Sequence, residues 1–351
     1  MTRHEEQDDA GRQQGRRSRV LKAAGLTLAA ALVVGIGTAG WAYWHLNDNI
    51  KSVDIDNALG DNRPAKAVTA PSPSGSASAS PLPTEAVNIL VLGSDSRSGE
   101  ENQALGGGDS SGARSDTAMV VHIDAGRTTA TVVSIPRDTL VTRPSCPLPD
   151  GGSTAVAYGA MFNTAYSVGG PVCAVKTVES LTDVRMDHYI EVDFSGFAKL
   201  VDALGGVTVT TDEDIDDDDS HLHLAAGTHH LDGTRALALA RTRHGIGDGS
   251  DLGRIGLQQA LVKALLQQIA STDLLTSPTE LYTVADAVTG SLTTDTGLDS
   301  LAALMELGQS LKGLSVAHLR TVTMPVVAAP SDPNRVVAQE PAASELWASL
   351  R

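Results

Sequence analysis

Residues 114–138 read RSDTAMVVHIDAGRTTATVVSIPRD, and this stretch predicts the centre of the fold. The largely apolar run 118–123 and the β-branched run 130–135 suit two strands of a sheet that is covered on both faces. The Asp-Ala-Gly-Arg sequence at 124–127 supplies a turn between them. The sequence therefore predicts a buried antiparallel hairpin whose open ends, RSD and PRD, meet at one edge of the sheet.

Charged side chains gather at those two ends. Because strand side chains alternate between faces, Arg114 and Asp116 point the same way if the first strand already runs through them. Arg137 closes the second strand, so one carboxylate and two guanidinium groups meet beside a dry sheet. Such a cluster taken alone is usually a salt bridge at a strand end. A functional interpretation therefore depends on the rest of the chain.

The N-terminal segment has the pattern of a membrane anchor. Basic residues precede an apolar run, residues 23–45, that is long enough to cross ~30 Å of hydrocarbon as a helix. Residues 1–22 are then a cytoplasmic tail, residues 46–83 a Pro/Ser/Ala-rich linker, and residues 84–351 an extracytoplasmic domain. A cleaved signal peptide is the alternative, but no Ala-x-Ala site follows the run. We expect a single-pass plasma-membrane protein with a cytoplasmic N-terminus.

Charge limits the partners of the exported part. Six of the 26 Lys and Arg and four of the 42 Asp and Glu lie in residues 1–22, which leaves 20 against 38 and a net charge of −18. Such a domain repels nucleic acid, and the short cytoplasmic tail has no room for a DNA-binding fold. A polyanionic substrate would need a local cationic pocket or a bridging metal ion.

The chain has two cysteines, Cys146 and Cys173. In an oxidising compartment we expect them to pair, and closing that loop stabilises a fold by roughly 3 to 4 kcal/mol. No further cysteine and no metal-ligand spacing accompanies them, which argues against a cysteine-based catalytic or metal site.

The exported region alternates strands and helices, as α/β folds do. An apolar strand at 87–93 runs into the polar turn Ser94-Asp-Ser-Arg-Ser-Gly, and such turns bind phosphate in many α/β proteins. This signal is weak alone, because the Lys of a Walker A loop and the glycine spacing of a dinucleotide site are absent. A helix, a strand, a second helix and a second strand are expected at 171–181, 188–194, 196–204 and 207–211.

Residues 212–219 contain seven acids in eight positions, and four histidines follow before residue 231. The acidic run lacks the Gly turn and the distal Glu of an EF-hand loop, so we expect a solvated turn in preference to a Ca²⁺ site. The histidines show no ordered spacing that would indicate zinc.

A second cationic group lies where two predicted helices meet. The helices are expected at 234–241 and 253–269. Arg241 and Arg243 flank a Thr at the end of the first helix. Arg254 and Gln258 are four residues apart, so they stack on one face of the second helix. One short segment thus brings three arginines and a glutamine around a Gly-rich loop.

Seven short motifs follow one another along the chain. They are GSDSR at 93–97, ARSDT at 113–117, SIPRD at 134–138, FNTAYSVGG at 162–170, DFSGFAKLVDALGGV at 193–207, LDGTRALALARTRH at 231–244 and DLGRIGLQQ at 251–259. In this order, behind a single predicted anchor, they resemble the LytR-CpsA-Psr family from about residue 86 to 270, and more loosely to the C-terminus. One position departs from the pattern: many members have Arg where this chain has Leu257, which puts substrate choice in question.

The resemblance implies a three-layer α/β/α domain with a central mixed sheet, tethered to a single transmembrane helix. It implies a phosphotransferase that attaches an anionic glycopolymer, such as teichoic acid, capsule or arabinogalactan, to the muramic acid 6-hydroxyl of peptidoglycan. The donor is polyprenyl-pyrophosphate-linked glycopolymer, and polyprenyl phosphate is released. A glycan-binding protein for the same lipid and a pyrophosphatase are the alternatives, because both would use the same site.

The resemblance also implies the site residues. Asp95 and Asp116 hold Mg²⁺, with Mn²⁺ as the alternative ion, on the pyrophosphate. The rim of a prenyl-binding pocket carries Arg114, Arg137, Arg241, Arg243, Arg254 and Gln258, and the expected catalytic residues among them are Arg137, Arg241 and Arg243. Planar guanidinium donors and a hard cation suit a pyrophosphate. Asp95 and Asp138 are both candidates for the group that accepts the hydroxyl proton.

Overall fold

The structure, a computed structural model, describes residues 37–66, 85–94, 115–148, 150–243, 251–271 and 277–351. The chain divides into two units, Met1–Asp48 and Asn49–Arg351. In the first unit, residues 37–48 are helical. Within the described part of the chain, no helix combines the length and the apolar composition needed to span a bilayer. The predicted cytoplasmic tail and most of the predicted anchor lie outside the described residues.

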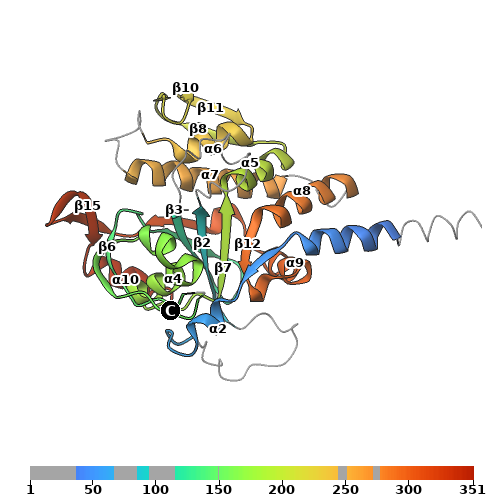
Figure 1. Cartoon of the computed structure of the whole chain (residues 1–351). Coiled ribbons are helices and arrows are strands. Elements are labelled where there is room, and N and C mark those ends of the chain that lie inside the picture. The colour runs from blue at the N-terminus through green and yellow to red at the C-terminus, as the bar shows by residue number, and fades with distance from the viewer. Residues whose placement is uncertain (1–36, 67–84, 95–114, 149, 244–250, 272–276) are drawn as a thin grey trace, which may run out of the picture. The chain divides into compact units, whose positions relative to one another are not determined.

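The second unit is built on a seven-stranded mixed sheet (Figure 1). Its strands are β1 (Lys51–Val53), β2 (Val87–Ser94), β3 (Ser115–Ile123), β4 (Ala130–Ser134), β7 (His188–Asp193), β12 (Leu292–Asp295) and β13 (Leu319–Thr323). Their order across the sheet is β1-β12-β7-β2-β3-β4-β13. β2 lies parallel to β7 and antiparallel to β3, which pairs antiparallel with β4. The predicted central hairpin is therefore confirmed as β3 and β4.

Helices cover both faces of this sheet. The described helices of this unit are α2 (Ile55–Leu59), α4 (Thr164–Thr182), α5 (Phe194–Ala203), α6 (Gly233–Arg241), α7 (Asp251–Ser271), α8 (Pro278–Ser291), α9 (Leu301–Ser310) and α10 (Ala342–Ala348), with short 3-10 turns at Thr296–Leu298 and Val316–His318. On one face, Leu90 of β2 shares a buried core with Val178 of α4 and Trp347 of α10. On the other face, Ile89 shares a core with Leu307 of α9. Neighbouring residues of β2 thus face opposite helical layers, as in an α/β/α domain.

A second core lies at one end of the sheet. Four short strands form two small sheets there, β8 (Val207–Thr211) with β11 (Gly227–Leu231) and β9 (Ile215–Asp217) with β10 (Leu222–Leu224). Val207, Ile215, Leu239 and Leu261 are buried between these strands and helices α5, α6 and α7. Figure 1 shows the group beyond the ends of β2 and β7. The strand predicted at 207–211 is confirmed, but it belongs to this second core and not to the central sheet.

The prediction of a linker over residues 46–83 is wrong for its first part. β1 is an edge strand of the central sheet, paired in parallel with β12. Ile55 and Leu59 of α2 are buried in the main core, and Glu179 of α4 accepts hydrogen bonds from Nε and Nη2 of Arg63. Elements this short carry too little periodicity to be recognised, and long-range contacts alone join them to the domain. Residues 67–84 lie outside the described residues.

Cys146 and Cys173 form a disulfide, as predicted. Cys173 lies in α4, which is interrupted at Gly169 and Gly170 by non-helical backbone, so its second segment begins near Pro171 as predicted. A side chain at Gly169 would meet Cys173 Cβ at 2.7 Å, which explains the glycine beside the disulfide.

The remaining strands form two hairpins, β5 (Leu140–Arg143) with β6 (Ala157–Met161) and β14 (Val326–Ala329) with β15 (Asp332–Ala338).

Candidate active site

A cavity of about 470 Å³ lies between the ends of β2 and β3 and the helices of the second core. Its walls are mainly apolar. They include Val91, Leu92 and Met119 from the strands, Phe194, Phe197 and Leu200 from α5, and Leu237, Leu261, Val262 and Leu265 from α6 and α7. Polar lining residues gather around Asp116, and we call them, together with Arg137, the polar rim: Asp116, Arg137, Arg241, Arg243, Arg254 and Gln258.

Asp116 is the junction of the polar rim. Its Oδ1 accepts a hydrogen bond from Arg137 Nη1 at 2.6 Å, so the two open ends of the hairpin meet as predicted. Its Oδ2 lies 4.0 Å from Arg243 Nη2, and its backbone oxygen accepts a hydrogen bond from Arg254 Nη2 at 3.2 Å. Three arginines from separate elements therefore converge on one residue of β3.

α7 presents Arg254 and Gln258 to the sheet from one face, as their spacing predicted. Gln258 Nε2 donates to Thr117 Oγ1 at 2.9 Å and to the backbone oxygen of Ala240 at 3.0 Å. Arg254 and Gln258 are 3% and 7% exposed, so they are the buried members of the polar rim and join α6 and α7 to β3. Gln259, which sequence reasoning did not single out, makes a parallel link through Nε2 to Ser134 Oγ at 3.2 Å.

Arg241 and Arg243 both reach the cavity from the end of α6. The Arg241 guanidinium lies 5.0 Å from the centroid of the Phe194 ring, a cation–π contact on the cavity wall. Thr242 between them is buried, and its hydroxyl group bonds to the backbone oxygen of Ala238. Arg243 is more accessible than Arg137 or Asp116, with 42% of its side chain exposed against 17% and 25%. This Thr-centred arrangement places two guanidinium groups at the same opening.

Two predicted site residues, Asp95 and Arg114, lie outside the described residues. Ser94 of β2 pairs with Ser115 of β3, the neighbour of Asp116, so the described part of each strand ends beside the polar rim. Asp138 lies next to the rim: its Oδ2 is 3.6 Å from Arg137 Nε, and its Oδ1 accepts a hydrogen bond from Arg335 Nη1 at 3.2 Å. Arg335 comes from β15, and no local sequence signal connected it with the site.

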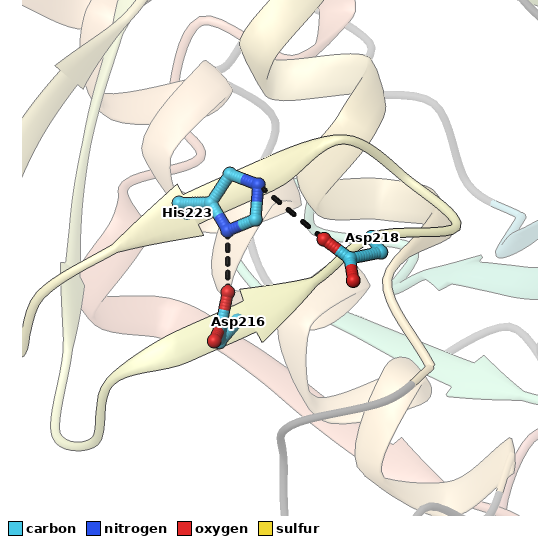
Figure 2. A group of neighbouring side chains, drawn as sticks. All are labelled: Asp216, Asp218 and His223. Atoms are coloured by element: carbon cyan, nitrogen blue, oxygen red, sulfur yellow. Dashed lines mark hydrogen bonds and ion pairs between the residues drawn. The ribbon is translucent and has the colours of Figure 1, made fainter.

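Six of the seven acids at 212–219 are exposed, as the prediction of a solvated turn requires, but Asp217 departs from it. Asp217 is 1% exposed and lines the cavity. Asp216 and Asp218 instead face outward with His223, as Figure 2 shows. Their ligand atoms lie within 4.8 Å of one another, but all three side chains are largely exposed. The strand alternation of β9 separates the buried acid from the exposed ones.

The fold and the site define an α/β protein with a largely apolar cavity, beside which arginines gather around the Asp116 carboxylate. Residues 42–351 match the LytR_cpsA_psr family, and the chain belongs to this family. The curated relatives include cell wall biosynthesis protein LcpA of Corynebacterium glutamicum, which is 34% identical over 269 residues covering 69% of this chain and 50% of the relative. They also include a polyisoprenyl-teichoic acid–peptidoglycan teichoic acid transferase, TagU of Bacillus cereus, 37% identical over 195 residues covering 55% and 56%. The chain thus spans about half the length of these relatives.

Solved structures share the fold. The LytR-Csp2A-Psr enzyme from Actinomyces oris superposes with a TM-score of 0.60 at 23% identity, covering 86% of this chain and 95% of that one. TagT bound to LI-WTA superposes with a TM-score of 0.58 at 24% identity, covering 85% and 97%. These similarities support the mixed α/β architecture.

Proposed function

We propose that the protein is a transferase that moves an anionic glycopolymer from a polyprenyl-pyrophosphate carrier to peptidoglycan. The acceptor is the muramic acid 6-hydroxyl, and polyprenyl phosphate is the second product. The names of two relatives, a cell wall biosynthesis protein and a teichoic acid transferase, support this class of reaction.

One observation carries the proposal: a single cavity joins apolar walls to a rim of guanidinium groups. Its volume of about 470 Å³ falls within the range of roughly 300 to 1,000 Å³ that is typical of small-molecule sites. Apolar walls suit a hydrocarbon chain because burying such a chain removes apolar surface from water. Arg137 and Arg243 lie partly exposed beside Asp116, where the chain would meet its pyrophosphate. A prenyl pyrophosphate therefore fits in one orientation.

The rim residues suit the chemistry of the transfer. The acceptor oxygen attacks the glycan-side phosphorus, a new P–O bond forms, and the bond from that phosphorus to the bridging oxygen breaks. The electron pair leaves with polyprenyl phosphate, and the hydroxyl proton passes to a base, for which Asp138 is a candidate. Arg137, Arg241 and Arg243 donate hydrogen bonds to the phosphate oxygens, and one donor aimed at developing charge is worth about 3 to 4 kcal/mol.

We include Mg²⁺ in the proposal, with Mn²⁺ as the alternative, held by Asp116 and Asp95. Asp116 suits a hard cation because its carboxylate is 25% exposed at the rim. Mg²⁺ commonly takes one or two carboxylates and completes its shell with phosphate oxygens and water. When bound, the ion would offset negative charge on the pyrophosphate. Arg137 meanwhile holds one oxygen of Asp116 and so fixes the direction of the carboxylate.

We further propose that residues 23–45 anchor the protein in the plasma membrane and that the domain lies outside. The basic residues before the apolar run support this orientation. Protease treatment of intact cells is expected to remove the domain, as followed by immunoblotting with an antibody against it. A domain that stays protected until the cells are lysed would overturn the proposed location.

The function is tested with the full chain in lipid nanodiscs, a synthetic prenyl-pyrophosphate glycan and peptidoglycan fragments. Mass spectrometry is expected to detect a phosphodiester-linked adduct on the fragment, lost with a chelator and restored by Mg²⁺. Glycan phosphate released to water without an adduct would identify a pyrophosphatase. Retention of intact donor with neither product would identify a binding protein.

A further inference from the structure

The β9–β10 hairpin divides the acidic run into two sets. Across the hairpin, Asp216 pairs with His223, and both side chains face solvent (Figure 2). Asp217 points the opposite way, is 1% exposed and lines the cavity. The outward acids contact the His223 ring at the surface, whereas the inward carboxylate must find hydrogen-bond donors within the protein.

Three backbone N–H groups donate to the Asp217 carboxylate. Its Oδ1 accepts from Asp219 N at 3.0 Å and from Ser220 N at 3.3 Å, which closes the turn after β9. Its Oδ2 accepts from Arg243 N at 2.8 Å, across 26 residues of sequence. The carboxylate therefore joins the hairpin to the residue that carries an accessible guanidinium group of the polar rim.

A second contact supports the same junction. The hydroxyl groups of Ser220 and Thr242 lie 3.0 Å apart and are both buried. The backbone at Thr242 and Arg243 is thus held from one side by two neighbouring groups of the hairpin. From this backbone position the Arg243 side chain extends to the rim, where its Nη2 lies 4.0 Å from Asp116 Oδ2.

We propose that Asp217 is a positioning residue for Arg243. By accepting the Arg243 N–H, it fixes the point from which that long side chain starts and so limits where the guanidinium can reach. A group that contacts a reacting phosphate must be held to within a fraction of an ångström, and this is the task of the residues that support it. The identity of the ligand rests on the proposed function, whereas the backbone contact does not.

The test compares four full-length proteins in nanodiscs: the parent, Asp217→Asn, Arg243→Ala and the double variant. Asn keeps a carbonyl oxygen for the turn but turns an NH₂ group toward Arg243 N, so the bond between them is lost. In the parent background we expect Asp217→Asn to lower kcat/KM for transfer by about 10- to 100-fold per folded protein. In the Arg243→Ala background we expect Asp217→Asn to change kcat/KM by less than about twofold, because the effects of two residues that act as one unit are non-additive.

Asp216→Asn is the matched control, since it removes the same charge from the adjacent position on the outward face. It is expected to leave kcat/KM within about twofold of the parent, as surface charge changes usually do. Ser220→Ala is the second variant should Asp217→Asn fail to fold. This substitution removes only the hydroxyl contact with Thr242, so the expected decrease in kcat/KM is smaller. That decrease should likewise vanish in the Arg243→Ala background.

Two results would overturn the inference: a parental kcat/KM for folded Asp217→Asn, or the same fold-loss in both backgrounds, which a purely structural role predicts. The same cycle is also measured by calorimetric titration with inorganic pyrophosphate. If the parent binds pyrophosphate but forms no transfer product, the proposed function fails and the titration alone decides the role of Asp217. If the parent binds none, both proposals fall.

Discussion

Arg137 makes a short contact at the rim, 2.6 Å from its Nη1 to Asp116 Oδ1. The pair is only partly buried, with the two side chains 17% and 25% exposed. Pairs this close to solvent contribute about 0 to 1 kcal/mol to stability, so stability alone gives a weak reason for the contact. Its place at the meeting ends of β3 and β4 gives a stronger one, because rigid strands fix the distance from guanidinium to carboxylate.

We therefore predict that Arg137→Ala lowers the rate of glycopolymer transfer about a hundredfold, equivalent to about 3 kcal/mol, with little change in Tm. The loss of one donor to the developing phosphate charge is the cause. Arg137→Lys should recover only part of the rate, because Lys lacks the planar two-pronged donor. Transfer kinetics and thermal melts measure the two effects.

Arg235→Ala is the control, because Arg235 is an exposed arginine on α6. It should leave both the transfer rate and Tm unchanged. If Arg137→Ala instead melts well below the parent while its folded fraction transfers glycan at the parental rate, the pair is only a salt bridge.

A site residue can be predicted from the sequence when its place follows from the regular geometry of a single strand or helix. Asp116 with Arg137, and Arg254 with Gln258, follow from strand alternation and from helical spacing, which need no knowledge of the tertiary fold. Asp217 could not be found that way, because its neighbours share its charge and only the register of β9 buries it. Arg335 was missed because it reaches Asp138 across 197 residues of sequence.

Among the elements, α4 depends most visibly on a covalent link. Its two segments are separated at Gly169 and Gly170, and Cys173 in the second segment is bonded to Cys146. The same helix begins beside the site, since Asn163 N donates to the backbone oxygen of Arg137 at 3.1 Å. The disulfide therefore restrains an element that contacts the rim through its N-terminal end.

We predict that replacing Cys146 and Cys173 together with Ala lowers the free energy of unfolding by about 3.5 kcal/mol. The estimate is the chain entropy released when a loop of 27 residues is opened. Urea denaturation of the parent and the double variant measures it. Parent protein treated with dithiothreitol serves as the control, and its free energy of unfolding should be close to that of the variant. Equal free energies of unfolding for the oxidised parent and the variant would contradict the prediction.

The longer elements were predictable, and the shorter ones were not. β2, β3, β4, α6 and α7 carry apolar patterns long enough to identify, and all five stand within a few residues of their predicted limits. β1 and α2 have three and five residues, and only pairing with β12 and burial of Ile55 reveal them as part of the domain. β8 was predicted as a strand, but its pairing with β11 depends on the burial of both strands in the second core.

At the scale of the whole molecule, stability rests on two cores and on a few polar junctions. One junction joins β7 to β12, where His188 Nδ1 and the backbone N–H groups of Tyr189 and Gly297 contact the Asp295 carboxylate. Burial raises the pKa of Asp295, but the hydrogen bonds from these groups outweigh it and hold the pKa below its usual 3.8. The folded protein therefore binds a proton at Asp295 less readily than the unfolded chain does.

This sign fixes the expected pH dependence. Asp295 contributes stability that is fully present above its unfolded pKa and is lost as the pH falls through its lower folded pKa. We predict that Asp295→Asn has a lower Tm than the parent at neutral pH. The difference in Tm between the two proteins should shrink as the pH falls below 3.8. Asp299→Asn, at an exposed position nearby, is the control and should track the parent throughout. A gap in Tm that stays constant down to the acid limit would contradict the assignment.

The register of β9 also bears on which changes in length the gene can tolerate. A single codon inserted between those for Ile215 and Asp217 would rotate the rest of the strand by one face, because strand side chains repeat every two residues. Asp217 would then turn to solvent, an outward acid would enter the second core, and Arg243 N would lose its acceptor. Two inserted codons would preserve the parity of the strand. Length variation among descendants of this sequence should accordingly be rare in β9 and more frequent in the turn that follows it.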